Sequence, residues 1–253
     1  MARGVAVLVG VNHVNPANHG GIRLELPRCE ELVDAMEKTL DRFNYNKIEV
    51  FKTERATCSN VSNALRTGVQ SLESGDMLVF YYIGHGGTSH DPEGDEEDTI
   101  DESLVLYDGY LKDDALADIW VLANRNPEAR LFIISDCCYA EGMVRLVRNR
   151  ARVRRPIRMF KKGDPIVPRD ALQGQIIHYA ASAENEVAAN GAFTCALLDA
   201  FHHQASYKEN YVELYANTKC YPCVKGRQRY VEHGPVTQKF RESEPFRIQM
   251  DDT

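Results

Sequence analysis

Two segments of the chain place reactive side chains directly after runs of apolar residues. "MLVFYYIGHGG" (77–87) leads into His85 between glycines, and "LFIISDCCYAEG" (131–142) leads into Asp136, Cys137 and Cys138. A cysteine is a strong nucleophile as thiolate, and a nearby imidazole can hold its proton and later deliver it to a leaving amine. These residue types therefore predict acyl transfer, peptide hydrolysis in particular, with the amide N–H groups of Gly86 and the nucleophilic cysteine stabilising the oxyanion.

The chemistry requires elements that bring the two segments together. Apolar runs without alternation predict strands that are covered on both faces, at residues 5–11, 48–51, 77–84, 131–136, 176–182 and 246–250. Helical spacing of apolar residues predicts helices at 29–43, at 60–72 after the potential caps Ser59 and Asn60, at 113–124 and at 192–204. The alternation predicts an α/β fold, a three-layer α/β/α sandwich with a mostly parallel sheet of about six strands.

The position of the reactive segments in such a sheet can also be predicted. Functional loops of parallel sheets lie beyond the carboxyl ends of the strands. If the strands at 77–84 and 131–136 are parallel neighbours, His85 and the two cysteines leave the sheet at the same edge. A cysteine pair or a histidine at a strand end also occurs for packing alone, so the prediction depends on both segments occurring together.

Composition limits the classes of protein to consider. The 253 residues are 43% hydrophobic, which suits one domain spanning 1–253, and no apolar run reaches the roughly 18–20 residues of a membrane-spanning helix. The seven cysteines are odd in number and dispersed, as in a reducing compartment, so we expect a cytoplasmic protein without a membrane partner. "CYPC" (220–223) is either two thiols in a loop or a redox or metal pair.

Charge is distributed unevenly along the chain. The net charge of −7 argues against a nucleic-acid partner for the whole molecule. Residues 91–102 nevertheless carry eight acidic and no basic side chains, and residues 145–162 carry nine basic and no acidic ones. Blocks of like charge repel themselves and stay solvated, so both are predicted to be loops.

"YYIGHGG" and "ISDCCYAEG" together resemble motifs of the caspase-like cysteine peptidases, specifically the metacaspases and orthocaspases. "VAVLVGVNH", "DESLVLYDG" and "YAASAENEVAANGAFTCALLDAF" resemble further parts of that family, so the similarity extends over most of residues 5–204. The resemblance implies the caspase-like fold. It also implies a large-subunit-like part (1–144), a basic linker (145–168) and a small-subunit-like part (169–253).

Site residues follow from the same resemblance. Cys138 is the nucleophile, because the family places it two residues after the aspartate, and His85 is the general base and acid. Asp136 occupies the pocket position associated with cleavage after Arg or Lys, and a carboxylate there would attract a guanidinium or ammonium group. Cys29 and Ile83 are further substrate-binding positions. The sequence departs from the family at Leu32, where a second pocket acid would fall, and at Ile83, which replaces a serine.

The charged segments have family counterparts. Self-cleavage would fall within the basic linker, with candidate sites Arg150, Arg152, Arg155 and Arg158; a solvated connector and a contact to nucleic acid are the alternatives. Asp101, Asp113 and Asp114 resemble three of the four calcium ligands of metacaspases, but Arg145 stands at the place of the fourth. A cation there should oppose calcium binding, so no cofactor is expected.

The resulting prediction is a cysteine endopeptidase that acts on polypeptides after Arg or Lys. Two alternatives remain: a catalytically silent caspase-like scaffold and a caspase-like peptidase that prefers Asp. A monomer and a homodimer are both compatible with the sequence.

Overall fold

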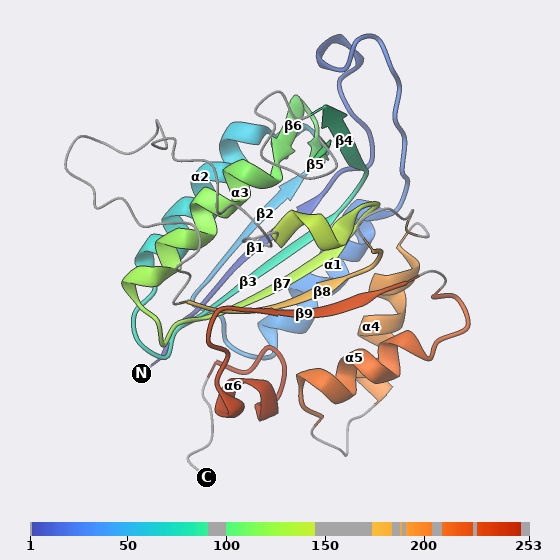
Figure 1. Cartoon of the computed structure of the whole chain (residues 1–253). Coiled ribbons are helices and arrows are strands. Elements are labelled where there is room, and N and C mark those ends of the chain that lie inside the picture. Colours follow the sequence, from blue (N-terminus) through green and yellow to red (C-terminus); the bar gives the residue numbers. More distant parts are fainter. Residues whose placement is uncertain are drawn as a thin grey trace, which may run out of the picture.

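A six-stranded sheet forms the centre of the molecule in the computed structural model, which describes residues 2–90, 100–144, 174–183, 188, 191–203, 209–224 and 227–248. The strand order is β2-β1-β3-β7-β8-β9. These strands are β1 (Gly4–Gly10), β2 (Lys47–Lys52), β3 (Met77–Ile83), β7 (Arg130–Asp136), β8 (Gln175–Ala180) and β9 (Arg229–His233). All neighbours are parallel except β9, which runs antiparallel to β8 (Figure 1). The predicted fold class is therefore confirmed.

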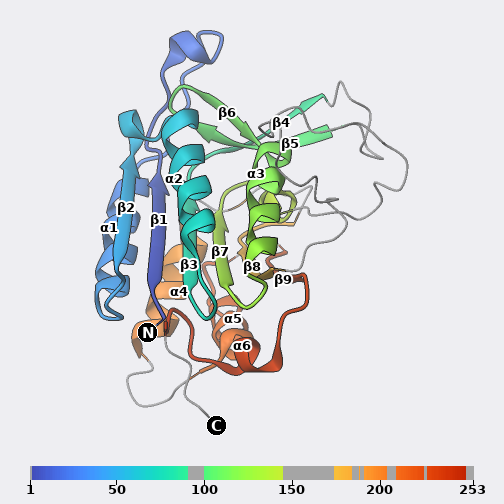
Figure 2. The same cartoon turned by 90° about the vertical axis from the view of Figure 1, so that its left-hand side faces the viewer.

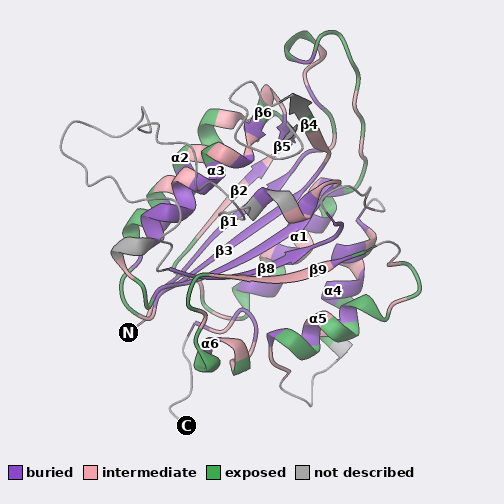
Figure 3. Ribbon diagram, viewed as in Figure 1, coloured by how far each residue is buried: buried purple, intermediate pink, exposed green. Residues whose placement is uncertain are grey.

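Helices cover both faces of this sheet. They are α1 (Cys29–Asp41), α2 (Cys58–Ser71), α3 (Asp113–Trp120), α4 (Ala192–His203), α5 (Tyr211–Lys219) and α6 (Gln238–Glu242), with short 3-10 turns at η1 (Pro16–Asn18), η2 (Thr53–Arg55), η3 (Val121–Arg125) and η4 (Ala140–Val144). Successive strand side chains point to opposite faces. Val7 and Val9 thus pack with α2 and α3, and Ala6 and Leu8 pack with α1. The middle strands are buried along their length (Figure 3).

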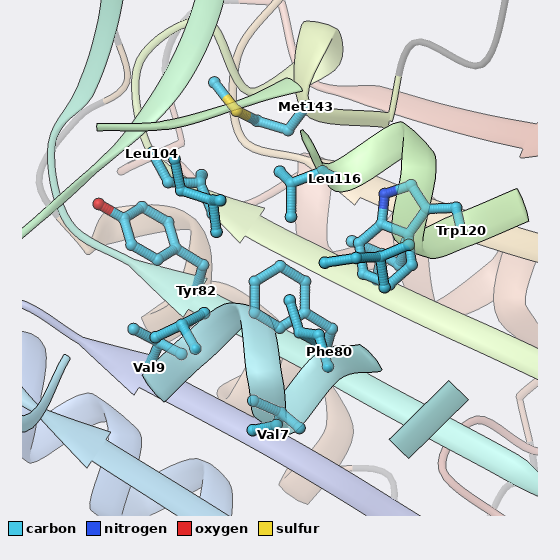
Figure 4. Close-up of a cluster of buried hydrophobic side chains, with 14 of the residues drawn as sticks. Val7, Val9, Phe80, Tyr82, Leu104, Leu116, Trp120 and Met143 are labelled. Carbon is cyan, nitrogen blue, oxygen red and sulfur yellow. The ribbon is translucent and has the colours of Figure 1, made fainter. Parts of the chain in front are cut away.

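The face covered by α2 and α3 contains a continuous apolar cluster. Phe80 of β3 lies with its ring centroid 5.8 Å from that of Trp120 of α3. Leu104 and Leu116 complete the contact between the sheet and α3 (Figure 4). Burying each such side chain stabilises the fold by roughly 1.5–3 kcal/mol. This packing fixes β3 and β7 as rigid supports for the loops that follow them.

A second, smaller sheet lies at the end where the parallel strands finish. It is antiparallel and consists of β4 (Gly86–His90), β5 (Ile100–Leu106) and β6 (Gly109–Lys112) (Figure 2). Its first strand begins directly after His85, and the Val105 N–H donates to the His85 carbonyl at 3.0 Å. The small sheet therefore fixes the backbone of the histidine segment.

Three sequence predictions about elements are wrong. Residues 100–102 belong to β5, although the charge pattern predicts a loop over 91–102. Residues 246–248 form no strand, because Phe246 has a φ of 66° and its carbonyl accepts a hydrogen bond from the Tyr45 hydroxyl. The sixth strand is instead β9. Helix α2 begins at Cys58, and its cap is Thr57, whose side chain accepts from the Asn60 N–H at 3.2 Å, rather than Ser59 or Asn60.

Candidate active site

The histidine and cysteine segments leave neighbouring strands at the same level. β3 and β7 pair in parallel from Met77 and Arg130 to a last pair of Ile83 and Asp136. His85 and Cys138 each lie two residues beyond that last pair, and the Gly84 N–H donates to the Asp136 carbonyl at 3.4 Å. The predicted meeting of the two segments at one edge of the sheet is confirmed.

Gly86 brings the two backbones into close contact. A Cβ atom placed on Gly86 would lie 1.9 Å from the Cys138 carbonyl oxygen and 3.2 Å from the Cys138 nitrogen. No side chain can occupy that space, because real Cβ contacts are essentially never shorter than 3.0 Å. Glycine at position 86 thus allows the histidine segment to pack directly on residues 137–140, which contain the predicted nucleophile and are called the nucleophile loop below.

Hydrogen bonds fix the backbone of His85, whereas its ring atom Nε2 has no partner among the described residues. Its carbonyl accepts hydrogen bonds from the Tyr82 hydroxyl at 2.7 Å and from the Val105 N–H. The His85 Nε2 atom is shielded from solvent and has no hydrogen-bond partner among the described residues. An imidazole nitrogen in this state can exchange a proton with a neighbouring thiol or with a substrate.

The nucleophile loop turns sharply and is held by Ser182, which follows β8. Tyr139 adopts a left-handed backbone with a φ of 57°, a strained conformation for a non-glycine residue. The buried Ser182 hydroxyl donates to the Cys137 carbonyl at 3.0 Å and accepts from the Ala140 N–H at 3.1 Å. One side chain therefore fixes both ends of the turn that contains Cys138.

The two adjacent cysteines have different environments. Cys138 is half-buried, whereas Cys137 is buried in the cluster beneath α3. Burial raises the pKa of the Cys137 thiol well above its ordinary value, and the nearby Cys138 and Asp136 raise that pKa further. Cys137 therefore stays protonated at neutral pH, as expected of a structural thiol.

Asp136 is buried at the last residue of β7. Its Oδ2 atom accepts hydrogen bonds from the Thr194 N–H at 2.9 Å and the Thr194 hydroxyl at 2.7 Å. Its Oδ1 atom has no partner among the described residues. Burial raises the pKa of this carboxyl to about 6, while the bonds from Thr194 act in the opposite direction.

The other predicted pocket residues surround this carboxylate. Ile83 pairs with Asp136 across the strands. Burial raises the pKa of the Cys29 thiol to about 12, and the charge of Asp136 contributes to that rise. Leu32 lies on the same side, because a Cβ on Gly191 would lie 2.6 Å from Leu32 Cδ1 and 3.6 Å from Ile83 Cδ1. The surroundings of the acid are thus largely apolar.

The remaining predicted residues are only partly placed. Arg150, Arg152, Arg155 and Arg158 lie outside the described residues, as does Arg145. Asp113 is buried in the first turn of α3, Asp114 follows it, and only the backbone of Asp101 is described. Cys220 and Cys223 are exposed free thiols. In the described ranges, no group of three or more His, Cys, Asp or Glu side chains has an arrangement suited to a metal ion.

Ser182, Thr194 and Tyr81 were not identified from the sequence. Each is a common buried residue type, and each acts on a partner 42 or more positions away along the chain, as with Thr194 and Asp136 (58 positions). The one signal for Ser182 and Thr194 is their place within residues 179–201, the segment that resembles the family's small subunit. No described helix is both long enough and apolar enough to cross a membrane.

Comparisons with known proteins place these observations in a family. The metacaspase, peptidase C14 domain matches residues 5–147. Metacaspase-4 of Arabidopsis thaliana is 32% identical over 55% of this chain and 34% of its own length, and Metacaspase-9 of the same plant is 35% identical over 55% and 44%. The matched region is thus less than half of these relatives.

A solved structure extends the likeness in fold to nearly the whole chain. The crystal structure of protein GSU0716 from Geobacter sulfurreducens superposes with a TM-score of 0.78, covering 97% of this chain and 98% of that one at 23% identity. The fold is therefore shared well beyond the region that the family match covers. The match over residues 5–147, more than half of the chain, shows that this protein belongs to the metacaspase family of peptidases, C14.

Proposed function

We propose that this protein is a cysteine endopeptidase that hydrolyses peptide bonds after Arg or Lys with a His85/Cys138 dyad. The observation that carries the proposal is the packing of Gly86 on the Cys138 backbone, which brings the segment of His85 against that of Cys138. The half-buried Cys138 and the unpartnered Nε2 of His85 supply the two groups that thiol proteolysis requires.

The reaction proceeds by acyl transfer. His85 accepts the Cys138 proton, and the thiolate sulfur attacks the carbonyl carbon of the substrate. The N–H groups of Gly86 and Cys138 are assigned to the negatively charged oxygen of the tetrahedral intermediate. His85 then gives its proton to the leaving amine, and water, deprotonated by His85, hydrolyses the thioester and restores the thiol.

Asp136 is assigned to the recognition of a basic side chain. A buried carboxylate with one unpartnered oxygen gains most from a cationic partner, because leaving that oxygen unpaired costs free energy. An aspartate side chain in the same place would put a second carboxylate into an apolar site, which opposes the Asp-preferring alternative.

Self-processing in the basic linker follows from that specificity. Residues 145–168 connect η4 to the segment before β8 and contain the four candidate sites Arg150, Arg152, Arg155 and Arg158. We expect activity without calcium, since the sequence has Arg145 where the resemblance places a fourth acidic ligand.

Purified wild type, Cys138→Ala and the matched control Cys223→Ala test the proposal. Each is incubated with fluorogenic peptides ending in Arg, Lys or Asp, with calcium or with a chelator, and its intact mass is then measured. We expect wild type and Cys223→Ala to cleave the Arg and Lys peptides in either condition and to yield fragments ending within 145–168. Cys138→Ala should be slower by about a thousandfold or more and stay intact.

The other outcomes identify the alternatives. Cleavage of the Asp peptide alone would show the Asp-preferring enzyme, and strict dependence on calcium would show that the acidic side chains bind the ion despite Arg145. Absence of turnover and of processing in all three proteins would favour the catalytically silent scaffold.

A further inference from the structure

A series of buried hydrogen bonds runs from β3 through α4 to Asp136. The Tyr81 hydroxyl donates to Thr194 Oγ1 at 3.0 Å, and Thr194 Oγ1 donates to Asp136 Oδ2 at 2.7 Å. A hydroxyl has a single proton. Because Thr194 receives its hydrogen bond from Tyr81, its own proton is directed to the carboxylate, and the Thr194 N–H binds the same oxygen at 2.9 Å.

The position of Thr194 in α4 strengthens this contact. Thr194 is the third residue of α4, whose first N–H groups have no partner within the helix. The positive end of the helix dipole therefore faces Asp136, which favours the ionised carboxylate. Oδ2 receives two donors from one residue, while Oδ1 receives none among the described residues.

Among the residues that the structure describes, the groups that interact with Asp136 across the site carry no positive charge. Burial raises the pKa of four groups: Cys29 of α1, Tyr81 of β3, Cys137 after β7, and Cys195 of α4. The charge of Asp136 raises each of these pKa values further. All four are therefore neutral near pH 7. Arg28 interacts with Cys195, but its side chain is mostly exposed.

We propose that Thr194, oriented by Tyr81, is a positioning residue that binds one oxygen of Asp136 and leaves the other as the acceptor for the basic side chain of the substrate. This inference rests on the proposed function of Asp136. Leu32 and Ile83 supply apolar surface on the same side, so recognition of the cation depends on Oδ1.

The positioning has a consequence for the charge of the pocket. Burial raises the pKa of Asp136 to about 6, and the Thr194 hydrogen bonds limit that rise because they favour the ionised form. Without the Thr194 hydroxyl, Asp136 takes up its proton at higher pH and loses its attraction for a cation. A neutral-to-charged hydrogen bond of this type changes a pKa by about one or more.

Thr194→Val removes the hydroxyl and nearly keeps the shape. The matched control is Thr218→Val, since Thr218 is equally buried but donates to the Leu214 carbonyl within α5, away from the site. Asp136 is titrated by carboxyl carbon NMR with labelled aspartate in the Cys138→Ala background, which prevents processing and needs no activity. We expect Thr194→Val to raise the pKa of Asp136 by about one, and Thr194→Ser and Thr218→Val to leave it within a few tenths.

Kinetics with Cys138 restored give the second readout. For an Arg peptide, the acid limb of kcat/KM should move to higher pH in Thr194→Val, so that kcat/KM at pH 6 falls about fivefold further than at pH 8. Thr194→Ser should restore the wild-type profile. If Thr194→Val does not fold, Tyr81→Phe decides the question, with a smaller shift in the same direction expected.

The outcomes separate the inference from the function on which it rests. An unchanged Asp136 pKa in folded Thr194→Val, or in Tyr81→Phe, overturns the positioning role even when wild type cleaves Arg peptides. Failure of wild type to cleave any basic peptide instead overturns the proposed function before a Thr194 variant is made.

Discussion

Two adjacent cysteines with the same intrinsic chemistry are separated by their surroundings. Cys137 points into the cluster of side chains between the sheet and α3, and Cys138 lies at the edge that the Gly86 backbone contacts. Only the ionised form of a thiol is a good nucleophile. Burial keeps Cys137 protonated, so the surroundings of the two thiols support the proposed role of Cys138 as the nucleophile without any difference in residue type.

Alkylation tests this selection directly. We expect iodoacetamide at pH 7.5 to modify the peptide containing residues 131–142 at the same rate in wild type and in Cys137→Ser, and at least about tenfold more slowly in Cys138→Ser. Mass spectrometry of digested samples separates this peptide from the exposed Cys220 and Cys223. Rapid modification in folded Cys138→Ser would show that Cys137 is accessible and would contradict the assignment.

At the scale of elements, the nucleophile loop depends on a segment that is distant in sequence. Ser182 lies beyond β8, yet it binds the Cys137 carbonyl and the Ala140 N–H, and the Glu141 N–H donates to the Ser182 carbonyl at 3.2 Å. Glu141 also forms an ion pair with Arg229 of β9 at 3.2 Å. The turn at Tyr139 is therefore held from β8 and β9, which compensates for its unfavourable backbone conformation.

Ser182→Ala should remove both side-chain hydrogen bonds that Ser182 makes to the nucleophile loop. Loss of the hydroxyl leaves two buried backbone groups without their partner, which costs about 1–3 kcal/mol, so the Tm should fall by several degrees. We expect kcat for an Arg peptide to fall by about tenfold or more with a smaller change in KM, because the attacking sulfur is misplaced while Asp136 is not. Ser71→Ala is the control, since Ser71 also donates to a backbone carbonyl, that of Gly68, but far from the site. Equal effects of the two substitutions on kcat would contradict the role of Ser182.

The elements that could be predicted from the sequence are those whose apolar pattern is local. The strands at 5–11, 77–84 and 131–136 and the helix at 29–43 were found because continuous apolar runs and helical spacing are features of adjacent residues. Residues 246–248 match the strand pattern but fail to form one. There the buried guanidinium of Arg130 donates hydrogen bonds to the carbonyls of Arg247 and Ile248. These partners are 117 and 118 positions away, so no local sequence pattern indicates the contact.

The same argument applies to the candidate site. His85 and Cys138 could be predicted because each follows a strand and is an unusual residue type there, and Asp136 because it ends the strand that leads to Cys138. Thr194 and Tyr81 were not, because their importance arises only when α4 is placed against β3 and β7. The small sheet was missed because β4 and β6 have only five and four residues and because β5 begins within the acidic segment, whose charge pattern predicts a loop.

At the scale of the molecule, the two sides of the basic linker form one structure. The family match ends at residue 147, but β8 pairs with β7 over six residue pairs, from Arg130 with Gln175 to Ser135 with Ala180. Helix α4 packs against α1 in the cluster on one face of the sheet (Figure 1). Ser182 and Thr194 come from the part after the linker, so the candidate site requires both parts.

Cleavage within the linker should therefore leave the two fragments associated. We expect a variant with an inserted recognition site for a sequence-specific protease between residues 150 and 158, in the Cys138→Ala background, to elute after cutting as one peak with the summed mass of both fragments. The parallel pairing of β7 with β8 and the hydrogen bonds from Arg130 to the Arg247 and Ile248 carbonyls hold them together. Separation would expose apolar side chains of both parts and remove two of the carbonyls to which the buried Arg130 guanidinium donates, leaving that of Gly75. Urea should separate the fragments only at the concentration that unfolds the uncut chain or slightly below.

Expression of residues 1–144 alone should give aggregated protein, because the apolar side chains that pack against the second part would be exposed. A soluble, monomeric and folded 1–144 fragment, as judged by circular dichroism and size-exclusion chromatography, would show instead that the large-subunit-like part is an independent unit and that Ser182 and Thr194 act across an interface between separate domains.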